Sequence, residues 1–162
     1  MKSFLTLAAM AFLTLAVQAR EMLAWTYQEL FDKADLVAIG RPISTTETKE
    51  ESNLSDIFPN VAVVGLSTNF ELGLVMKGEN STRKIVLHHY RVRDSEILEN
   101  GPFLAAFDPK QNASFLLFLK READGRYAPV TGQTDPMIQS ISKVSGAALY
   151  PSQRDKDSTG TP

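Results

Sequence analysis

Two adjacent histidines, His88 and His89, are the residues of this chain best suited to chemistry, since they are its only imidazoles. They lie in the apolar run KIVLHHYRV (84–92), where Tyr90 and Arg91 follow them directly. Histidine is the commonest protein metal ligand and the commonest general acid–base. One hypothesis is therefore a metal-dependent or other hydrolytic enzyme that uses His88 or His89.

The same run has the pattern of a β-strand, which argues against a shared metal ion. Adjacent residues of a strand point to opposite faces, so His88 and His89 would diverge. A zinc site needs three or four ligands, and the chain has no cysteine to supply them. We therefore predict no metal and no cofactor. We expect one histidine toward the core or under the helix and the other toward the surface beside Arg91, and the pattern does not say which.

Motifs for other kinds of catalysis are absent from the sequence. It contains neither a G-x-S-x-G nucleophile elbow nor a glycine loop that would hold phosphate. We therefore predict no catalytic residue and favour a binding role, with the enzyme as the alternative.

Aromatic and arginine side chains are typical of binding surfaces, and several could meet on one face of the domain. With the two histidines, the candidate binding residues are His88, His89, Tyr90, Arg91, Arg126, Tyr127, Gln133 and Asp135. The simpler interpretation, which we favour, is that they are strand-end residues making cross-strand pairs and turn hydrogen bonds.

The elements that would position these residues begin with one short helix. Thr26 and Glu29 have the spacing of a capping box, and Trp25 with Leu30 fits a hydrophobic staple. Apolar residues with helical spacing form one face, namely Tyr27, Leu30, Phe31 and Ala34.

Strand patterns follow the helix. They cover residues 35–45, 61–78, 84–92, 114–122 and 126–130, and residues 137–144 form a last strand or a short helix. In the second of these, Phe70, Leu72, Leu74 and Met76 alternate with polar or small residues. Residues 114–122 are apolar on both faces, which one sheet with one helix cannot bury. The predicted fold is therefore mainly β, a five- to six-stranded antiparallel OB-like barrel with a short N-terminal helix.

Four motifs occur in an order that resembles a family of exported bacterial proteins of unknown function. They are ADLVAIGRP (34–42), VMKG (75–78), FLLFLKREADGRYAPV (115–130) and the turn from Gly132 to Asp135. The family is similar to OB-type barrels, in outline to the netrin-like domain of the tissue inhibitors of metalloproteinases. Those inhibitors chelate the protease metal through an N-terminal cysteine, which this chain lacks, so the resemblance implies the fold and not the inhibition.

The first nineteen residues are typical of a signal peptide. Lys2 precedes the apolar run at 4–17, and cleavage is expected between Ala19 and Arg20. The run is shorter than the roughly 20 apolar residues that span a bilayer. We therefore predict a secreted or periplasmic protein with no membrane anchor after cleavage.

The remaining chain divides into one domain at 20–150 and a tail at 151–162, which has no apolar residue and is expected to be disordered. An exported domain without disulfides favours a bacterial origin. Cleavage would remove one cation of 17 and leave 16 against 19 acidic residues, a net charge of −3. This balance argues against nucleic acid as a partner. The leading hypothesis is an exported, non-enzymatic domain that binds a protein or glycan in the envelope or outside the cell.

Overall fold

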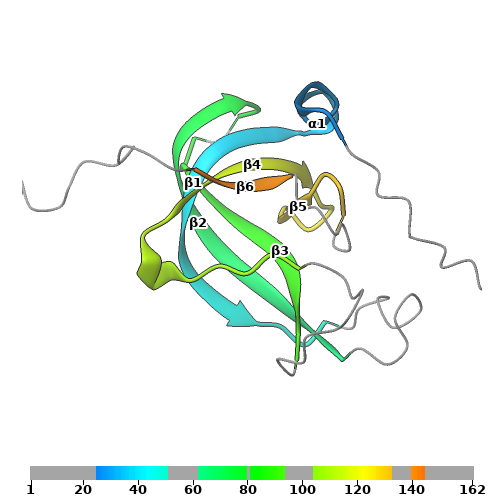
Figure 1. The fold of residues 1–162 in the computed structure, drawn as a ribbon, viewed down its shortest axis with the longest axis vertical. Coiled ribbons are helices and arrows are strands. Elements are labelled where there is room, and N and C mark those ends of the chain that lie inside the picture. Colours follow the sequence, from blue (N-terminus) through cyan, green and yellow to red (C-terminus); the bar gives the residue numbers. More distant parts are fainter. Residues whose placement is uncertain (1–24, 51–61, 80, 94–103, 133–139, 145–162) are drawn as a thin grey trace, which may run out of the picture.

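The chain is mainly β in the residues that the computed structural model describes, which are 25–50, 62–79, 81–93, 104–132 and 140–144 (Figure 1). Its elements are α1 (Tyr27–Lys33), β1 (Leu36–Glu47), β2 (Val63–Lys77), β3 (Lys84–Val92), a 3-10 turn (Pro109–Gln111), β4 (Ser114–Arg121), β5 (Tyr127–Pro129) and β6 (Ile141–Val144). The predicted signal peptide and tail, Gln133 and Asp135 lie outside the described residues. None of the helices described is long and apolar enough to cross a membrane.

Five strands close into a barrel in the order β1-β2-β3-β5-β4, because β4 also pairs with β1. β6 adds a sixth strand along β4. The predicted barrel with one short N-terminal helix is thus confirmed. One pairing, between β3 and β5 at Leu87 and Tyr127, is parallel. A closed ring with an odd number of strands requires such a pair, since strand direction cannot alternate all the way round.

The helix α1 begins with the predicted capping box. The Thr26 hydroxyl accepts the Glu29 amide at 3.2 Å, and the Glu29 carboxylate accepts the Thr26 amide at 2.8 Å. Only half of the predicted apolar face is buried, because Leu30 packs on the barrel while Tyr27 is 65% and Phe31 37% exposed. The helix therefore leaves two aromatic rings at the surface.

The core has two parts, one on each side of β4. Inside the barrel, Leu117 and Leu119 pack with residues of every other strand. On the outer side, Phe118 packs under α1 with Leu30 and Val37. β4 is therefore buried on both faces, as its sequence predicts, and α1 covers one side of the barrel (Figure 1).

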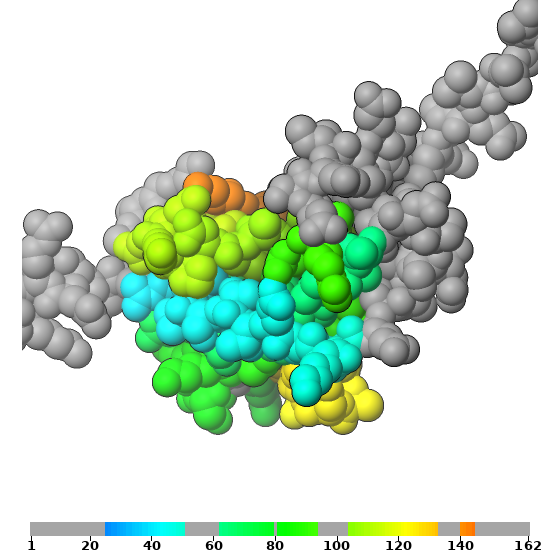
Figure 2. Space-filling view, turned by 90° about the horizontal axis from the view of Figure 1, so that it is seen from below, coloured from blue at the N-terminus to red at the C-terminus, as the bar shows by residue number. Residues whose placement is uncertain are grey.

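The segment that leads into β4 lies along β1, as the neighbouring yellow-green and cyan residues in Figure 2 show. A hydrogen bond from Arg41 Nη1 to Asn112 Oδ1, at 3.3 Å, joins the two. Farther back in the same segment, Phe107 packs against the barrel core. The segment is thus part of the barrel's packing.

Two bulges in β2 change which side chains face outward. Ile39 of β1 is opposite Leu74, but Gly40 is opposite Leu72, so Gly73 is an extra residue in β2. Met76 is a second extra residue, because Val37 is opposite Lys77 and Ala38 is opposite Val75. An inserted residue reverses the facing of those that follow. Leu72 is buried, whereas Leu74 and Met76 point outward and are 45% and 44% exposed. The alternation of apolar residues in this strand therefore does not mark one buried face.

Candidate functional site

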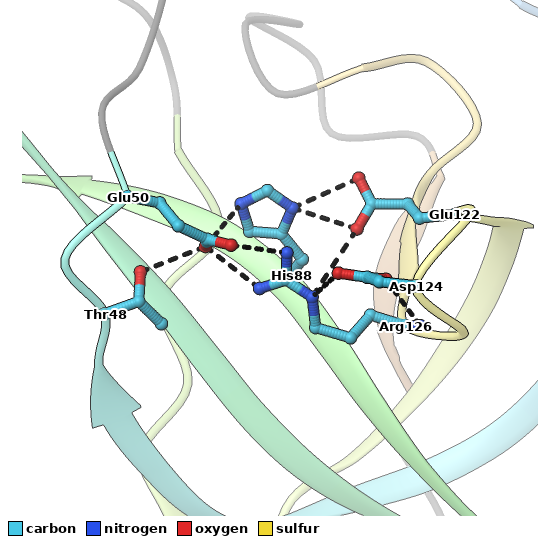
Figure 3. Close-up of polar contacts among 6 residues, drawn as sticks. All are labelled: Thr48, Glu50, His88, Glu122, Asp124 and Arg126. Carbon is cyan, nitrogen blue, oxygen red and sulfur yellow. Dashed lines mark hydrogen bonds and ion pairs between the residues drawn. The ribbon is translucent and has the colours of Figure 1, made fainter.

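The two histidines diverge as the strand pattern predicts. His89 lies inside the barrel and is 1% exposed, and His88 lies on the outer side of β3 and is 9% exposed. The expectation that Arg91 flanks the outer histidine is wrong. Arg91 pairs with Glu47 at the end of β1, and the arginine in the surroundings of His88 is Arg126 (Figure 3).

His89 belongs to a hydrogen-bonded chain inside the barrel. Its Nδ1 is 3.1 Å from the Ala105 carbonyl oxygen, to which it can only donate. Its Nε2 is 2.7 Å from the Thr68 hydroxyl, which lies 2.8 Å from the Thr45 hydroxyl. In neutral His89, Nε2 accepts from Thr68. Burial is the main reason that the pKa of His89 falls to about 4, although the hydrogen bond to Ala105 opposes the fall. His89 is thus an interior residue, away from any binding surface.

His88 sits between two carboxylates. Its Nδ1 is 3.1 and 3.0 Å from the two oxygens of Glu122, and its Nε2 is 3.3 Å from Glu50 Oε2 (Figure 3). Each ring nitrogen of His88 therefore lies against a carboxylate. We call this group the His88 cluster, and its members are Thr48, Glu50, His88, Glu122, Asp124 and Arg126.

Arg126 links two of the carboxylates of the His88 cluster, Glu50 and Asp124. Its guanidinium donates to both oxygens of Glu50, at 2.9 and 2.5 Å, and to Asp124 at 2.6 Å. The hydrogen bond from Arg126 is the largest cause that lowers the pKa of Glu50. The Arg126 backbone amide is the largest cause that lowers the pKa of Asp124. The Glu50 carboxylate in turn raises the pKa of Arg126, so these three groups are charged at neutral pH.

Three segments that are distant in the sequence build the His88 cluster. Glu50 follows β1, His88 lies in β3, and the other ionic members lie in the β4–β5 hairpin. The Thr48 amide donates to Gly65 of β2 at 2.8 Å, and the Thr48 hydroxyl donates to Glu50 at 3.1 Å. Only glycine permits this approach, because a Cβ at Gly65 would overlap the Thr48 hydroxyl. Sequence reasoning missed Glu50 and Glu122, since nothing local to either residue indicates a histidine partner.

The remaining predicted binding residues do not all gather here. Tyr90 lies next to His88, with ring centroids 5.0 Å apart, and burial raises the pKa of its hydroxyl. Tyr127 belongs to the barrel core, and Arg91 is at the far end of β3. The structure therefore brings together His88, Tyr90 and Arg126.

Ion pairing is what the His88 cluster is arranged to do. Across the described part of the chain, no three potential ligand side chains are placed to hold a metal ion. Each ring nitrogen of His88 already faces a carboxylate, and its side chain is 11% exposed. The contacts tie the end of β1 to the β4–β5 hairpin.

No protein-family model matches this chain, and no curated protein matches it either.

Replacing Arg126 by glutamine is expected to lower the free energy of unfolding by about 1 kcal/mol, as for a partly exposed ion pair. The substitution leaves Glu50 and Asp124 without their shared cation. Urea unfolding measures the change, and the difference from the unchanged protein should shrink in 1 M NaCl because salt screens exposed charges. The control is Arg93→Gln, because Arg93 is exposed and lies immediately after the end of β3. Equal effects of both substitutions would contradict a stabilising His88 cluster.

Proposed function

We propose that this protein is an exported, non-enzymatic binding domain that engages a partner protein in the bacterial envelope or outside the cell. The signal-peptide pattern supports export, and the motif order supports kinship with the OB-type barrel family. The ring order β1-β2-β3-β5-β4 with its parallel β3–β5 pair is in keeping with an OB-type barrel. The single observation that carries the binding role is an apolar surface beside α1.

That surface, which we call the outer apolar face, surrounds a hollow of about 360 Å³. Its lining comes from α1, β1, β2 and β4 and consists of Tyr27, Gln28, Phe31, Val37, Met76, Leu116 and Phe118. Leu74 extends it, because it is opposite Ile39 on β1, which is opposite Leu116 on β4. Exposed apolar side chains that gather in this way are typical of interaction sites.

A protein partner fits the outer apolar face better than a glycan does. Among the described residues that line the hollow, only Gln28 and the Tyr27 hydroxyl supply polar groups. A sugar needs many hydrogen bonds, whereas a protein can insert an apolar anchor side chain into such a hollow. Gly73 is essential to the arrangement, since its bulge turns Leu74 outward, and Met76 is itself the extra residue of a second bulge.

The alternative, a hydrolytic enzyme that uses His88 or His89, has less support from the geometry. His89 is enclosed in the barrel and hydrogen-bonded through both nitrogens. His88 is covered and faces a carboxylate on each side. A general base has to reach the proton that it removes.

Placing a photo-crosslinking amino acid at Met76 of the full-length chain is expected to trap one defined partner in the native host. The same amino acid at Ile43, which is 50% exposed but outside the hollow, is the matched control and should not trap that partner. Phe31→Glu should reduce the Met76 crosslink at least tenfold, since it puts a charge into the apolar contact. Equal crosslinking at the two positions, or a Met76 crosslink that Phe31→Glu leaves unchanged, would contradict the proposal.

A further inference from the structure

The outer apolar face combines a flat apolar floor with a wall formed by α1. We propose that its occupant is an amphipathic α-helix of the partner protein, an inference that rests on the protein-binding role proposed for this face. The helix would lie on the outer side of β4, β1 and β2, beside α1, whose side chains line the same hollow. Its apolar side chains, at helical spacing, would fill that hollow.

Three apolar side chains on adjacent strands form the floor. Leu116 of β4 is opposite Ile39 of β1, which is opposite Leu74 of β2. Neighbouring strands lie about 4.8 Å apart, so this row is about 10 Å wide. An α-helix with its side chains is about 10–12 Å across, so a single helix covers the row.

The wall is made by two rings of α1. Tyr27 and Phe31 are about one turn apart on this helix, and both line the hollow. The Tyr27 ring lies 5.9 Å from the Phe118 ring, between centroids, and Lys77 Nζ lies 5.2 Å from the centroid of Phe31. The same ammonium donates to the Phe31 carbonyl oxygen at 2.6 Å. The wall therefore has its shape before a partner binds, which lowers the entropic cost of binding.

The two central strands of the floor cannot accept an added strand. Residues 37–39 of β1 pair with β2 on one edge and with β4 on the other. β4 in turn pairs on its second edge with β5 and β6. A partner segment that adds as a strand needs an unpaired edge.

The side chains of the hollow offer little to an extended backbone either. Its polar groups, among the described residues, are the Tyr27 hydroxyl and the Gln28 amide, and the amide already donates to Asp32 at 2.8 Å. A buried backbone group without a hydrogen bond is costly. A helix satisfies its backbone groups internally, so it can lie on such a surface at no such cost.

The face is too small for a stable contact between two copies of this chain. Its exposed side chains are Tyr27 at 65%, Phe31 at 37%, Leu74 at 45% and Met76 at 44%. Since an aromatic side chain buries about 150–250 Å² and an aliphatic one less, the four together offer on the order of 400 Å². A standard interface buries about 800 Å² on each partner. The face is therefore suited to one helix of a partner and not to a second copy.

The test is a nuclear magnetic resonance titration of the full-length chain with three synthetic peptides of about 15 residues. The first has leucines at i, i+3, i+4, i+7 and i+8 among alanine, glutamate and lysine. The second has the same composition with its leucines at alternate positions, as in a strand, and the third is proline-rich. The first peptide is expected to give saturable shifts at residues 27–31, 37–39, 74–76 and 116–118. It should also gain helical circular dichroism on binding, and bind at least tenfold more tightly than the other two.

The variants for this titration are Met76→Glu and its control, Ile43→Glu. Met76→Glu should weaken binding of the first peptide at least tenfold, because it puts a charge into the apolar contact. Ile43 is 50% exposed but lies outside the hollow, so Ile43→Glu should leave the binding unchanged. The spectrum of Met76→Glu without peptide shows whether that variant is folded. If it is not, Tyr27→Glu takes its place with the same expected loss.

Four results would overturn the helical partner. They are no binding of the first peptide, equal or tighter binding of either other peptide, binding without a gain of helix, and binding that Met76→Glu does not weaken. The crosslink at Met76 in the native host tests the protein-binding role separately, since it uses no peptide. A trapped partner together with no binding of the first peptide would therefore contradict the helix and keep the proposed function.

Discussion

Replacing Phe70 by alanine is expected to lower the free energy of unfolding by about 3–5 kcal/mol, the range for removing a buried aromatic ring. Phe70 is 1% exposed and lies in the middle of the barrel. Its ring meets those of Phe107 and Phe115 edge-on, at centroid distances of 5.1 and 6.4 Å. The three rings come from β2, from the segment before β4 and from β4 itself, so the cavity would loosen three parts of the barrel at once.

Urea unfolding followed through the single tryptophan, Trp25, measures this loss. Phe31→Ala is the matched control, because Phe31 is 37% exposed and its removal leaves no enclosed cavity. We expect less than about 1 kcal/mol from the control. A domain of this size is stable by only about 5–15 kcal/mol. The Phe70→Ala variant should therefore unfold at a clearly lower urea concentration than the Phe31→Ala variant. A similar loss in the two variants would show that Phe70 does not organise the core.

The parts of the fold that the sequence predicted are those with local signals. The capping box of α1 needs only Thr26 and Glu29, three residues apart, and both of its hydrogen bonds are present. The barrel followed from the apolar residues on both faces of β4, whose two sides do pack against separate clusters. Such signals depend only on residues that are close in the sequence, so they can be recognised without knowing how the rest of the chain folds.

The features that the sequence did not predict depend on strand register and on ring closure. Alternation along 70–76 could not show that Gly73 and Met76 are extra residues, since a bulge exists only relative to the partner strand. The exposure of Leu74 and Met76, and with it the outer apolar face, follows from that register. The parallel β3–β5 pair likewise follows from the number of strands in the ring.

The candidate site also has one feature that the sequence predicted and others that it did not. The opposite directions of His88 and His89 follow from strand geometry and were predicted. The partners of His88 were not, because Glu50 and Glu122 reach it only when β1 and the β4–β5 hairpin come together around β3. The same closure placed Arg126 rather than Arg91 near His88.

Lowering the pH from 7 to 4 is expected to cost the barrel about 3 kcal/mol of stability through His89 alone. In the unfolded chain this histidine has an ordinary pKa of 6.5, and in the folded barrel its pKa is about 4. Between these values the unfolded state binds the proton and the folded state does not, so acid favours unfolding. The contribution is fully present above pH 6.5 and falls by about 1.4 kcal/mol for each pH unit down to pH 4.

The measurement compares urea unfolding of the unchanged protein and of His89→Gln from pH 7 to pH 4. Glutamine can donate to the Ala105 carbonyl and accept from the Thr68 hydroxyl, as neutral His89 does, but it does not titrate in this range. The carboxylates are common to both proteins, so their acid effects cancel in the difference between the two free energies. That difference should move by about 3 kcal/mol in favour of His89→Gln as the pH falls. A difference that stays constant would mean that His89 takes up a proton as readily in the folded barrel as in the unfolded chain. Burial against Phe107 and Thr68 would then not keep the ring neutral, and the interior of the barrel would have to admit water.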